Sequence, residues 1–107
     1  MNKRIAKKWT KALRSGKYEQ TNGKLQDHYG YCCLGVLCEL AVKEGVIETY
    51  SGGVLPEKVR GWAEIKSSEG QFFNSKNRIK YLVDYNDNMD FSFKQIAGII
   101  DRNVDRL

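Results

Sequence analysis

The sequence predicts a small α+β domain that occupies residues 1–107 as a single unit. First, the 107 residues match the length of one ordinary domain. Second, a hydrophobic content of 41% beside 29% charged residues is typical of globular proteins and unlike disordered segments. Third, about four segments show helical periodicity, and turn signals between them favour a few short antiparallel strands.

The first helix is expected over Asn2–Ser15. Its apolar residues recur at helical spacing and form one face: Ile5, Ala6, Trp9, Ala12 and Leu13. Gly16 follows as a C-terminal stop. The next segment, Tyr18–Gly30, is polar and contains the tight-turn pair Asn22-Gly23. Short strands are expected on either side of that turn, over Lys17–Gln20 and Lys24–Tyr29.

A second helix is expected over Tyr31–Glu44, the most apolar segment of the chain. The segment is apolar nearly all round, which is typical of a central buried helix. A buried strand is the rival interpretation, and the length of the segment and the stop at Gly45 favour the helix. Val46–Tyr50 is expected to form a short strand.

The second half of the chain predicts two further helices. One begins at Leu55-Pro56 with Pro in its first turn and buries Val59, Trp62 and Ala63. The other begins at Ser92, where Ser92 and Gln95 fit a capping box and Phe91 and Ile96 fit a hydrophobic staple. Its core stripe would contain Phe93, Ile96, Ala97, Ile100 and Val104. Between these helices we expect a polar loop over Lys66–Asn77, a strand over Ile79–Tyr85 and a polar turn over Asp84–Asp90.

Three cysteines, Cys32, Cys33 and Cys38, lie in one short apolar stretch. An odd, adjacent set does not suit a secreted disulfide framework, so we expect reduced thiols packed in the core of a cytosolic protein. Two alternatives involve His28, as a metal ligand beside the cysteines or as a base for a Cys32 nucleophile. The spacing matches no usual structural zinc pattern, and no third orienting group is evident. We therefore expect no metal and no cofactor.

Positive charge is concentrated at the start of the chain. Residues 1–24 hold eight basic residues and one acidic residue, whereas the whole chain carries a net charge of +5. A basic stripe on the first helix comprises Arg4, Lys7, Lys8, Lys11 and Arg14. Such a stripe suits phosphate groups, and its alternative interpretation is a solvated helix face. No apolar run is long enough to span a bilayer, and the lysines that follow Met1 argue against a signal peptide.

No sequence motif points to catalysis. Phosphate-binding loops and a nucleophile elbow are absent, and His28 is the one histidine. Asp84–Asp90 begins like a calcium loop, but Met89 replaces the required Gly and Gln95 replaces the required Glu. We therefore expect a binding protein rather than an enzyme.

A resemblance to a known family rests on four segments: Trp9–Gln20, Tyr31–Cys38, Leu55–Ala63 and Tyr85–Ile100. Tyr31–Cys38 is the most specific of them and reads Tyr-Cys-Cys-Leu-Gly-Val-Leu-Cys. Together they resemble a family of small proteins encoded by tailed bacteriophages, over nearly the whole chain. In that family the turn before the last helix often reads Asn-Asp-x-Gly, whereas Met89 takes the Gly position here. The resemblance implies a phage product in the bacterial host cytoplasm.

Small accessory phage proteins often inhibit host defence, so the resemblance suggests an anti-defence role by analogy. Our leading hypothesis is a non-enzymatic sponge that sequesters an anionic nucleotide second messenger, such as a cyclic oligonucleotide or an ADP-ribose derivative. Basic groups would pair with phosphates and aromatic rings would stack on bases. The expected contact residues are Arg14, Lys17, Tyr18, Gln20, Tyr31, Asn86 and Asp87.

Two other functions stay open at this point. One is a protein that binds and blocks a host defence protein, as anti-CRISPR proteins do. The other is binding of nucleic acid through the basic stripe, which would show a steep loss of affinity with salt. We also expect a homo-oligomer, because a small fold encloses a ligand more readily between subunits.

Overall fold

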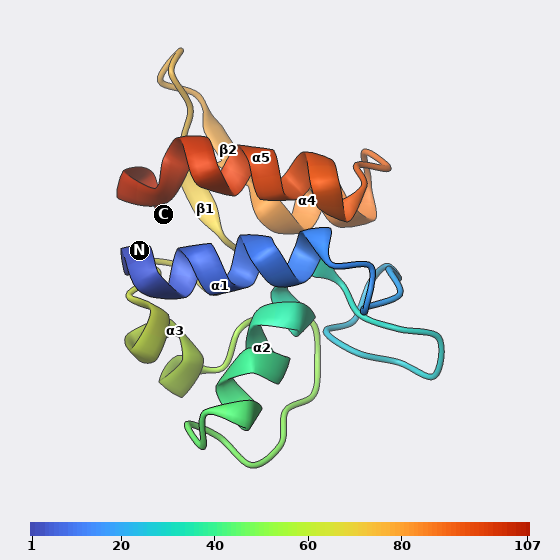
Figure 1. The fold of residues 1–107 in the computed structure, drawn as a ribbon. Coiled ribbons are helices and arrows are strands. Elements are labelled where there is room, and N and C mark those ends of the chain that lie inside the picture. The colour runs from blue at the N-terminus through green and yellow to red at the C-terminus, as the bar shows by residue number, and fades with distance from the viewer.

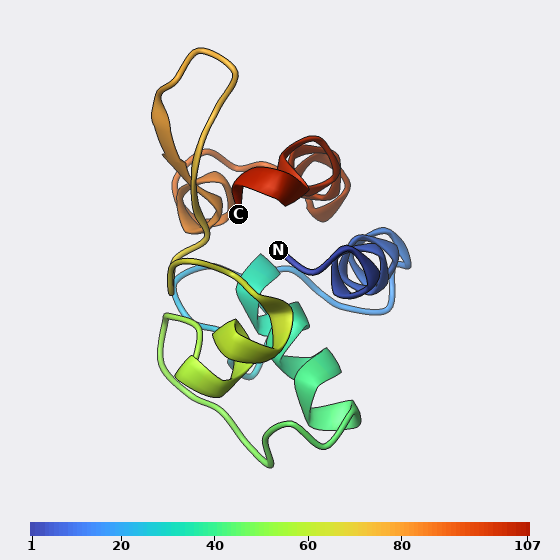
Figure 2. The same ribbon diagram turned by 90° about the vertical axis from the view of Figure 1, so that its left-hand side faces the viewer.

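Two helices that are far apart in the sequence pack side by side and run in opposite directions (Figures 1 and 2). They are α1 (Lys3–Arg14) and α5 (Phe93–Asn103) in the computed structural model, which describes residues 1–107. The other elements are α2 (Cys33–Lys43), α3 (Glu57–Ala63), β1 (Gln71–Phe73), β2 (Ile79–Tyr81), α4 (Leu82–Asp87) and the 3-10 helix η1 (Val104–Arg106). Five α-helices and one two-stranded antiparallel sheet confirm the α+β class.

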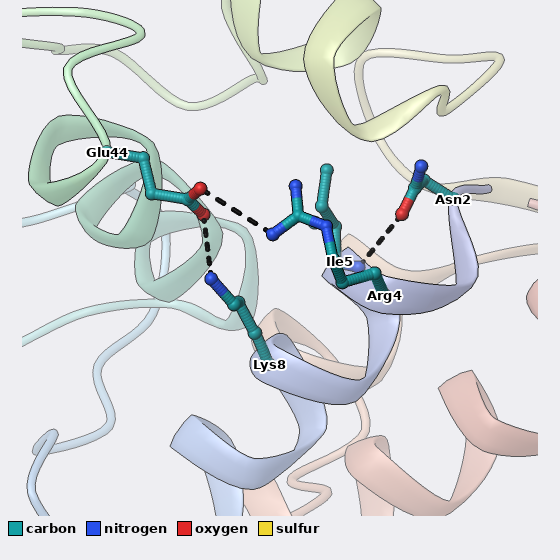
Figure 3. Close-up of polar contacts among 5 residues, drawn as sticks. All are labelled: Asn2, Arg4, Ile5, Lys8 and Glu44. Carbon is teal, nitrogen blue, oxygen red and sulfur yellow. Dashed lines mark hydrogen bonds and ion pairs between the residues drawn. The ribbon is translucent and has the colours of Figure 1, made fainter.

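The expected first helix is confirmed as α1, with Asn2 as its N-cap. The Asn2 side chain accepts a hydrogen bond of 3.0 Å from the Ile5 amide (Figure 3), which satisfies one otherwise free donor of the first turn. Trp9 is fully buried, and its indole Nε1 donates to the carbonyl of Cys33 at 2.9 Å. This bond joins α1 to the start of α2 inside the core.

The apolar segment forms a helix, α2, rather than the rival strand. Residues 32–38 are all buried, so this helix is central to the core. The three cysteines are free and buried, as the composition predicted. A Cβ on Gly35 would lie 1.7 Å from the carbonyl oxygen of Leu25, which shows that the backbone of the preceding loop lies directly against α2.

Three of the expected strands are wrong. Residues 17–29 form no strand, and only isolated bridges join Gln20 and Gln26 to Tyr31. The backbone there is held by bonds to loops and side chains instead, such as the Leu25 amide to Gly52 at 2.9 Å. Residues 46–50 also form no strand, because no neighbouring strand is available to pair with them.

The sheet lies partly where a loop was expected. Strand β1 falls inside the expected loop 66–77 and pairs with β2 in the register Phe72↔Lys80, with Phe72 buried against the core. The expected strand 79–85 ends at Tyr81, because the chain turns into α4 from Leu82 onward. Helix α4 therefore also replaces the first half of the expected turn 84–90. The hairpin projects away from the helices (Figure 2).

The two remaining helices form where the sequence predicts them, but Val104, expected in the core stripe of the last helix, lies in η1 and is only half-buried. Helix α3 buries Val59 and Ala63, while Trp62 is partly exposed and Pro56 occupies the N-cap rather than the first turn. Helix α5 has the expected capping box, in which Ser92 and Gln95 each accept an amide hydrogen from the other. No helix in the structure has both the length and the apolar character needed to cross a bilayer.

Candidate functional site

Four lysine side chains surround one small pocket beside α1. Its volume is about 250 Å³. We call it the lysine pocket, and its lining residues are Lys8, Lys11, Ala12, Ser15, Lys17, Tyr18, Leu40 and Lys43. No acidic residue lines it, so four positive charges face one recess that Ala12 and Leu40 also line with apolar side chains.

Three segments bring these lysines together. Helix α1 supplies Lys8 and Lys11, and the last turn of α2, which packs against α1, supplies Lys43. The chain reverses after α1 at Gly16, whose φ of 76° lies in the left-handed region that glycine adopts without a steric penalty. This turn places Lys17 and Tyr18 on the wall of the pocket.

Tyr18 fixes the position of Lys43. The Lys43 ammonium donates a hydrogen bond of 2.9 Å to the Tyr18 hydroxyl, and it lies 5.4 Å from the centre of the ring. Together these distances place the ammonium beyond the hydroxyl end of the ring rather than above its face. The hydrogen bond to Tyr18, with a smaller contribution from Glu39, raises the pKa of Lys43, so this lysine is charged at neutral pH.

Tyr31 supports Tyr18 from behind. The two rings meet edge to face, with centroids 5.2 Å apart and planes at 82°. Burial, and secondarily the charge of Glu39, raises the pKa of Tyr31, so its hydroxyl stays neutral. Tyr31 therefore contributes to the orientation of Tyr18 and does not itself line the pocket.

One acidic residue, Glu44, neutralises part of the basic stripe. Its carboxylate lies 3.7 Å from Arg4 and 3.5 Å from Lys8 (Figure 3). These ion pairs are solvent-exposed, so each contributes at most about 1 kcal/mol and is easily exchanged for another anion. Lys11, Lys17 and Lys43 form no ion pair in the structure. Positive charge is therefore uncompensated on the side of the pocket away from Glu44.

Two of the expected contact residues instead form a buried polar network. Asn86 is 1% exposed, and its Oδ1 accepts from Gln20 Nε2 at 2.9 Å and from the Cys33 amide at 3.1 Å. Its Nδ2 donates to the Thr21 carbonyl at 2.8 Å and to Asp87 at 2.9 Å. The Gln20 side chain also donates from Nε2 to the Phe91 carbonyl and accepts at Oε1 from the Phe93 amide. This network joins the loop after α1 to α2, α4 and α5.

Arg14, Asp87 and Lys7 do not line the lysine pocket. Arg14 forms an ion pair of 2.7 Å with Asp101 across α1 and α5. Asp87 accepts a hydrogen bond from the Gly23 amide at 3.1 Å. Lys7 lines a different groove, between α1 and the end of α5. Of the seven expected contact residues, the structure thus places only Lys17 and Tyr18 in the lysine pocket, together with Lys8 and Lys11 of the basic stripe.

The cysteines are placed as core residues. Burial raises the pKa of Cys32, of Cys33 and, to about 12, of Cys38, so all three thiols are protonated at neutral pH. His28 is exposed in the loop before α2. No three histidine, cysteine or acidic side chains form a cluster suited to a metal ion.

Four pocket residues were not indicated as site residues by the sequence: Ala12, Ser15, Leu40 and Lys43. Lys43 is a basic residue in the last turn of a helix, a position that the helix dipole favours in any protein. Its sequence context therefore gives no functional signal. Only the packing of α1 on α2 reveals that it faces the same recess as Lys11 and Lys17.

Comparison with known proteins identifies a family without identifying an activity. A family model described as a domain of unknown function, DUF8296, matches residues 1–104. No curated protein and no solved structure shows significant similarity to the chain. Since the family model spans every element from α1 to α5, the chain belongs to the DUF8296 family.

Proposed function

We propose that this protein is a non-enzymatic binder of a phosphate-bearing nucleotide and that the lysine pocket holds the phosphates. The observation that carries the proposal is the convergence of Lys8, Lys11, Lys17 and Lys43 on one recess with no acidic residue in its lining. Like charges brought together on a surface repel one another, so this arrangement costs stability unless an anion occupies it.

The pocket also offers surfaces for the rest of a nucleotide. The Tyr18 ring face is not covered by Lys43, and Ala12 and Leu40 supply adjacent apolar area. A nucleobase that stacks on Tyr18 would leave its phosphates within reach of Lys11, Lys17 and Lys43. Arg14, Gln20, Tyr31, Asn86 and Asp87 are engaged within the chain, so we assign them to shaping the surroundings rather than to contacting the ligand.

The biological setting that we propose is anti-defence by a phage protein in the bacterial cytoplasm. Stoichiometric capture of an immune nucleotide needs only affinity, which lysines and an aromatic ring provide without a catalytic group. The pocket of about 250 Å³ lies below the ~300–1,000 Å³ typical of ligand sites. We therefore propose that a second copy of the chain helps to enclose the ligand.

Native mass spectrometry of the intact protein with cyclic dinucleotides, cyclic trinucleotides and ADP-ribose tests this proposal. We expect one of these nucleotides to add a discrete mass to a defined oligomer. Calorimetry then measures the affinity of the protein for that nucleotide. The double variant Lys17→Ala/Lys43→Ala should lower that affinity at least about tenfold, equivalent to about 1.4 kcal/mol.

The matched control is Lys58→Ala/Lys94→Ala, which removes the same charge from exposed positions on α3 and α5. It should bind as the unmodified protein does. Equal losses in both double variants would mean that net charge, not the pocket, drives binding. A protein that takes up none of these nucleotides would contradict the proposal.

A further inference from the structure

The β1–β2 hairpin carries an exposed apolar pair and a basic tip. Phe73 and Ile79 are cross-strand partners, and each is 48% exposed. Side chains alternate across a strand, so the burial of Phe72 in the core directs Phe73 to the opposite, outer face. The hairpin from residue 71 to residue 81 contains three basic residues and no acidic one: Lys76, Arg78 and Lys80.

A groove runs along the base of this hairpin. Two adjoining recesses of about 380 and 210 Å³ share the same three lining residues, Lys66, Phe73 and Arg106. We call their union the hairpin groove. Asn74, Ser75 and Asn77 add polar groups to its wall, and Asp105 is its one acidic lining residue. Lys66 and Arg106 form no ion pair, so two unpaired cations line the same recesses as Phe73.

The hairpin tip is held in a fixed shape rather than left loose. Asn74 Oδ1 accepts the amide hydrogens of Lys76 at 2.9 Å and of Arg78 at 3.0 Å. Asn77 adopts a φ of 58°, a left-handed conformation that asparagine tolerates better than most residues. Lys76 and Arg78 are thereby presented on a constrained turn beside Phe73.

We propose that the hairpin groove binds single-stranded nucleic acid, with a base stacked on Phe73 and backbone phosphates at Lys66 and Arg106. Exposed aromatic rings between cations are how sequence-tolerant single-strand sites work, because every base has a face that stacks. The bases of a duplex are already stacked on one another, so a duplex would offer no free base face to Phe73. The side-chain amide of Asn77 suits the polar edge of an unpaired base. This site lies on different elements from the lysine pocket and does not depend on it.

Fluorescence anisotropy with a short fluorescein-labelled oligothymidylate and the full chain tests the proposal. Phe73→Ala should weaken oligothymidylate binding about tenfold or more. The separate variant Phe73→Tyr keeps an aromatic ring and should bind as the unmodified protein does. The matched control is Tyr29→Ala, because Tyr29 is 82% exposed in a different loop. It should leave the affinity unchanged.

Two further variants separate the contributions of charge and of site. Lys66→Ala/Arg106→Ala should reduce the slope of log affinity against log salt by about 1.4, for two phosphates released from a single strand. This variant keeps Phe73, so it tests the groove even if Phe73→Ala fails to fold. Lys17→Ala/Lys43→Ala, in the lysine pocket, should leave oligothymidylate binding intact.

Three results would overturn the proposal. The first is no binding of the oligothymidylate by the unmodified protein at low salt, which would instead favour an acidic protein segment as the partner. The second is a Phe73→Ala variant that folds, as judged by circular dichroism, and binds as tightly as the unmodified protein. The third is loss of binding in the lysine-pocket variant alone.

Discussion

Replacing Gly35 in the middle of α2 with alanine should destabilise the protein, although helix propensity alone predicts the opposite. Alanine is a better helix former than glycine by about 1 kcal/mol, so Gly35→Ala would stabilise an isolated helix. In the folded protein a Cβ at this position would lie 1.7 Å from the Leu25 carbonyl oxygen and 2.6 Å from its carbon. Real Cβ contacts essentially never fall below 3.0 Å, so the two backbones must separate by more than 1 Å.

The neighbour in this contact is backbone, and it has little freedom to move. Leu25 is fully buried, its amide donates to Gly52 at 2.9 Å, and its carbonyl accepts from Cys32 at 3.2 Å. Overpacking of a core costs about 1–3 kcal/mol and occasionally more, and a backbone clash belongs at the upper end. After the gain in propensity, we expect the free energy of unfolding to fall by about 2 kcal/mol. For a domain of this size that loss lowers Tm by roughly 8–16 °C.

Thermal and urea unfolding followed by circular dichroism measure this effect. The matched control is Gly61→Ala in α3, because a Cβ there meets no atom within 4 Å. Propensity alone acts at Gly61, so this control should be as stable as the unmodified protein or up to about 1 kcal/mol more stable. A Gly35→Ala protein with unchanged or raised stability would refute the close approach of Leu25 to α2.

Three further predictions concern the polar network, the surface and the thiols. Asn86→Leu should lower the free energy of unfolding, measured by urea denaturation, by at least about 2 kcal/mol, because it leaves several buried backbone and amide groups without partners. The control Asn88→Leu, at an exposed position nearby, should change that free energy by less than about 0.5 kcal/mol. A double-mutant cycle on Arg14 and Asp101 should give a coupling energy below about 1 kcal/mol, since the pair is exposed, and a larger value would mean that it stabilises the packing of α1 on α5. The native cysteines should react with a thiol reagent at neutral pH only after unfolding, and rapid labelling of the native protein would contradict their burial. Burial also raises the pKa of Cys38 from 9.0 to about 12. The free energy of unfolding should therefore be unaffected by this thiol below pH 9 and decline between about pH 9 and 12.

Helices α1, α2, α3 and α5 were predictable because their signals are local. The residues that form the apolar face around Trp9, and those of the capping box at Ser92, lie within a few helical turns of one another in the sequence. The sheet was not predictable in the same way. Phe72 and Phe73 are adjacent apolar residues without alternation, and a strand of three residues depends on a partner elsewhere in the chain. The short α4 was hidden because its residues from Asp84 to Asp87 are equally typical of a turn.

The candidate site was predicted only in part, and the reason is packing between distant segments. The sequence indicated Lys11, Lys17 and Tyr18, which lie close together along the chain. It could not indicate Lys43, which reaches the pocket only because α2 packs on α1. Gln20 and Asn86 were chosen as polar ligand contacts, yet they hydrogen-bond each other across 66 residues of sequence.

The pairing of α1 with α5 has a consequence for synthesis of the protein. Ile5, Trp9 and Leu13 on α1 are buried in the finished fold, but α5 is translated about 90 residues after α1. At roughly 5–20 residues per second, the ribosome needs several seconds to deliver α5, whereas a helix forms in about a microsecond. The part of the α1 surface that α5 covers in the folded protein therefore stays exposed for far longer than the helix takes to form. During that interval we expect the exposed apolar face to attract chaperones, and the core is complete only once α5 has left the ribosome.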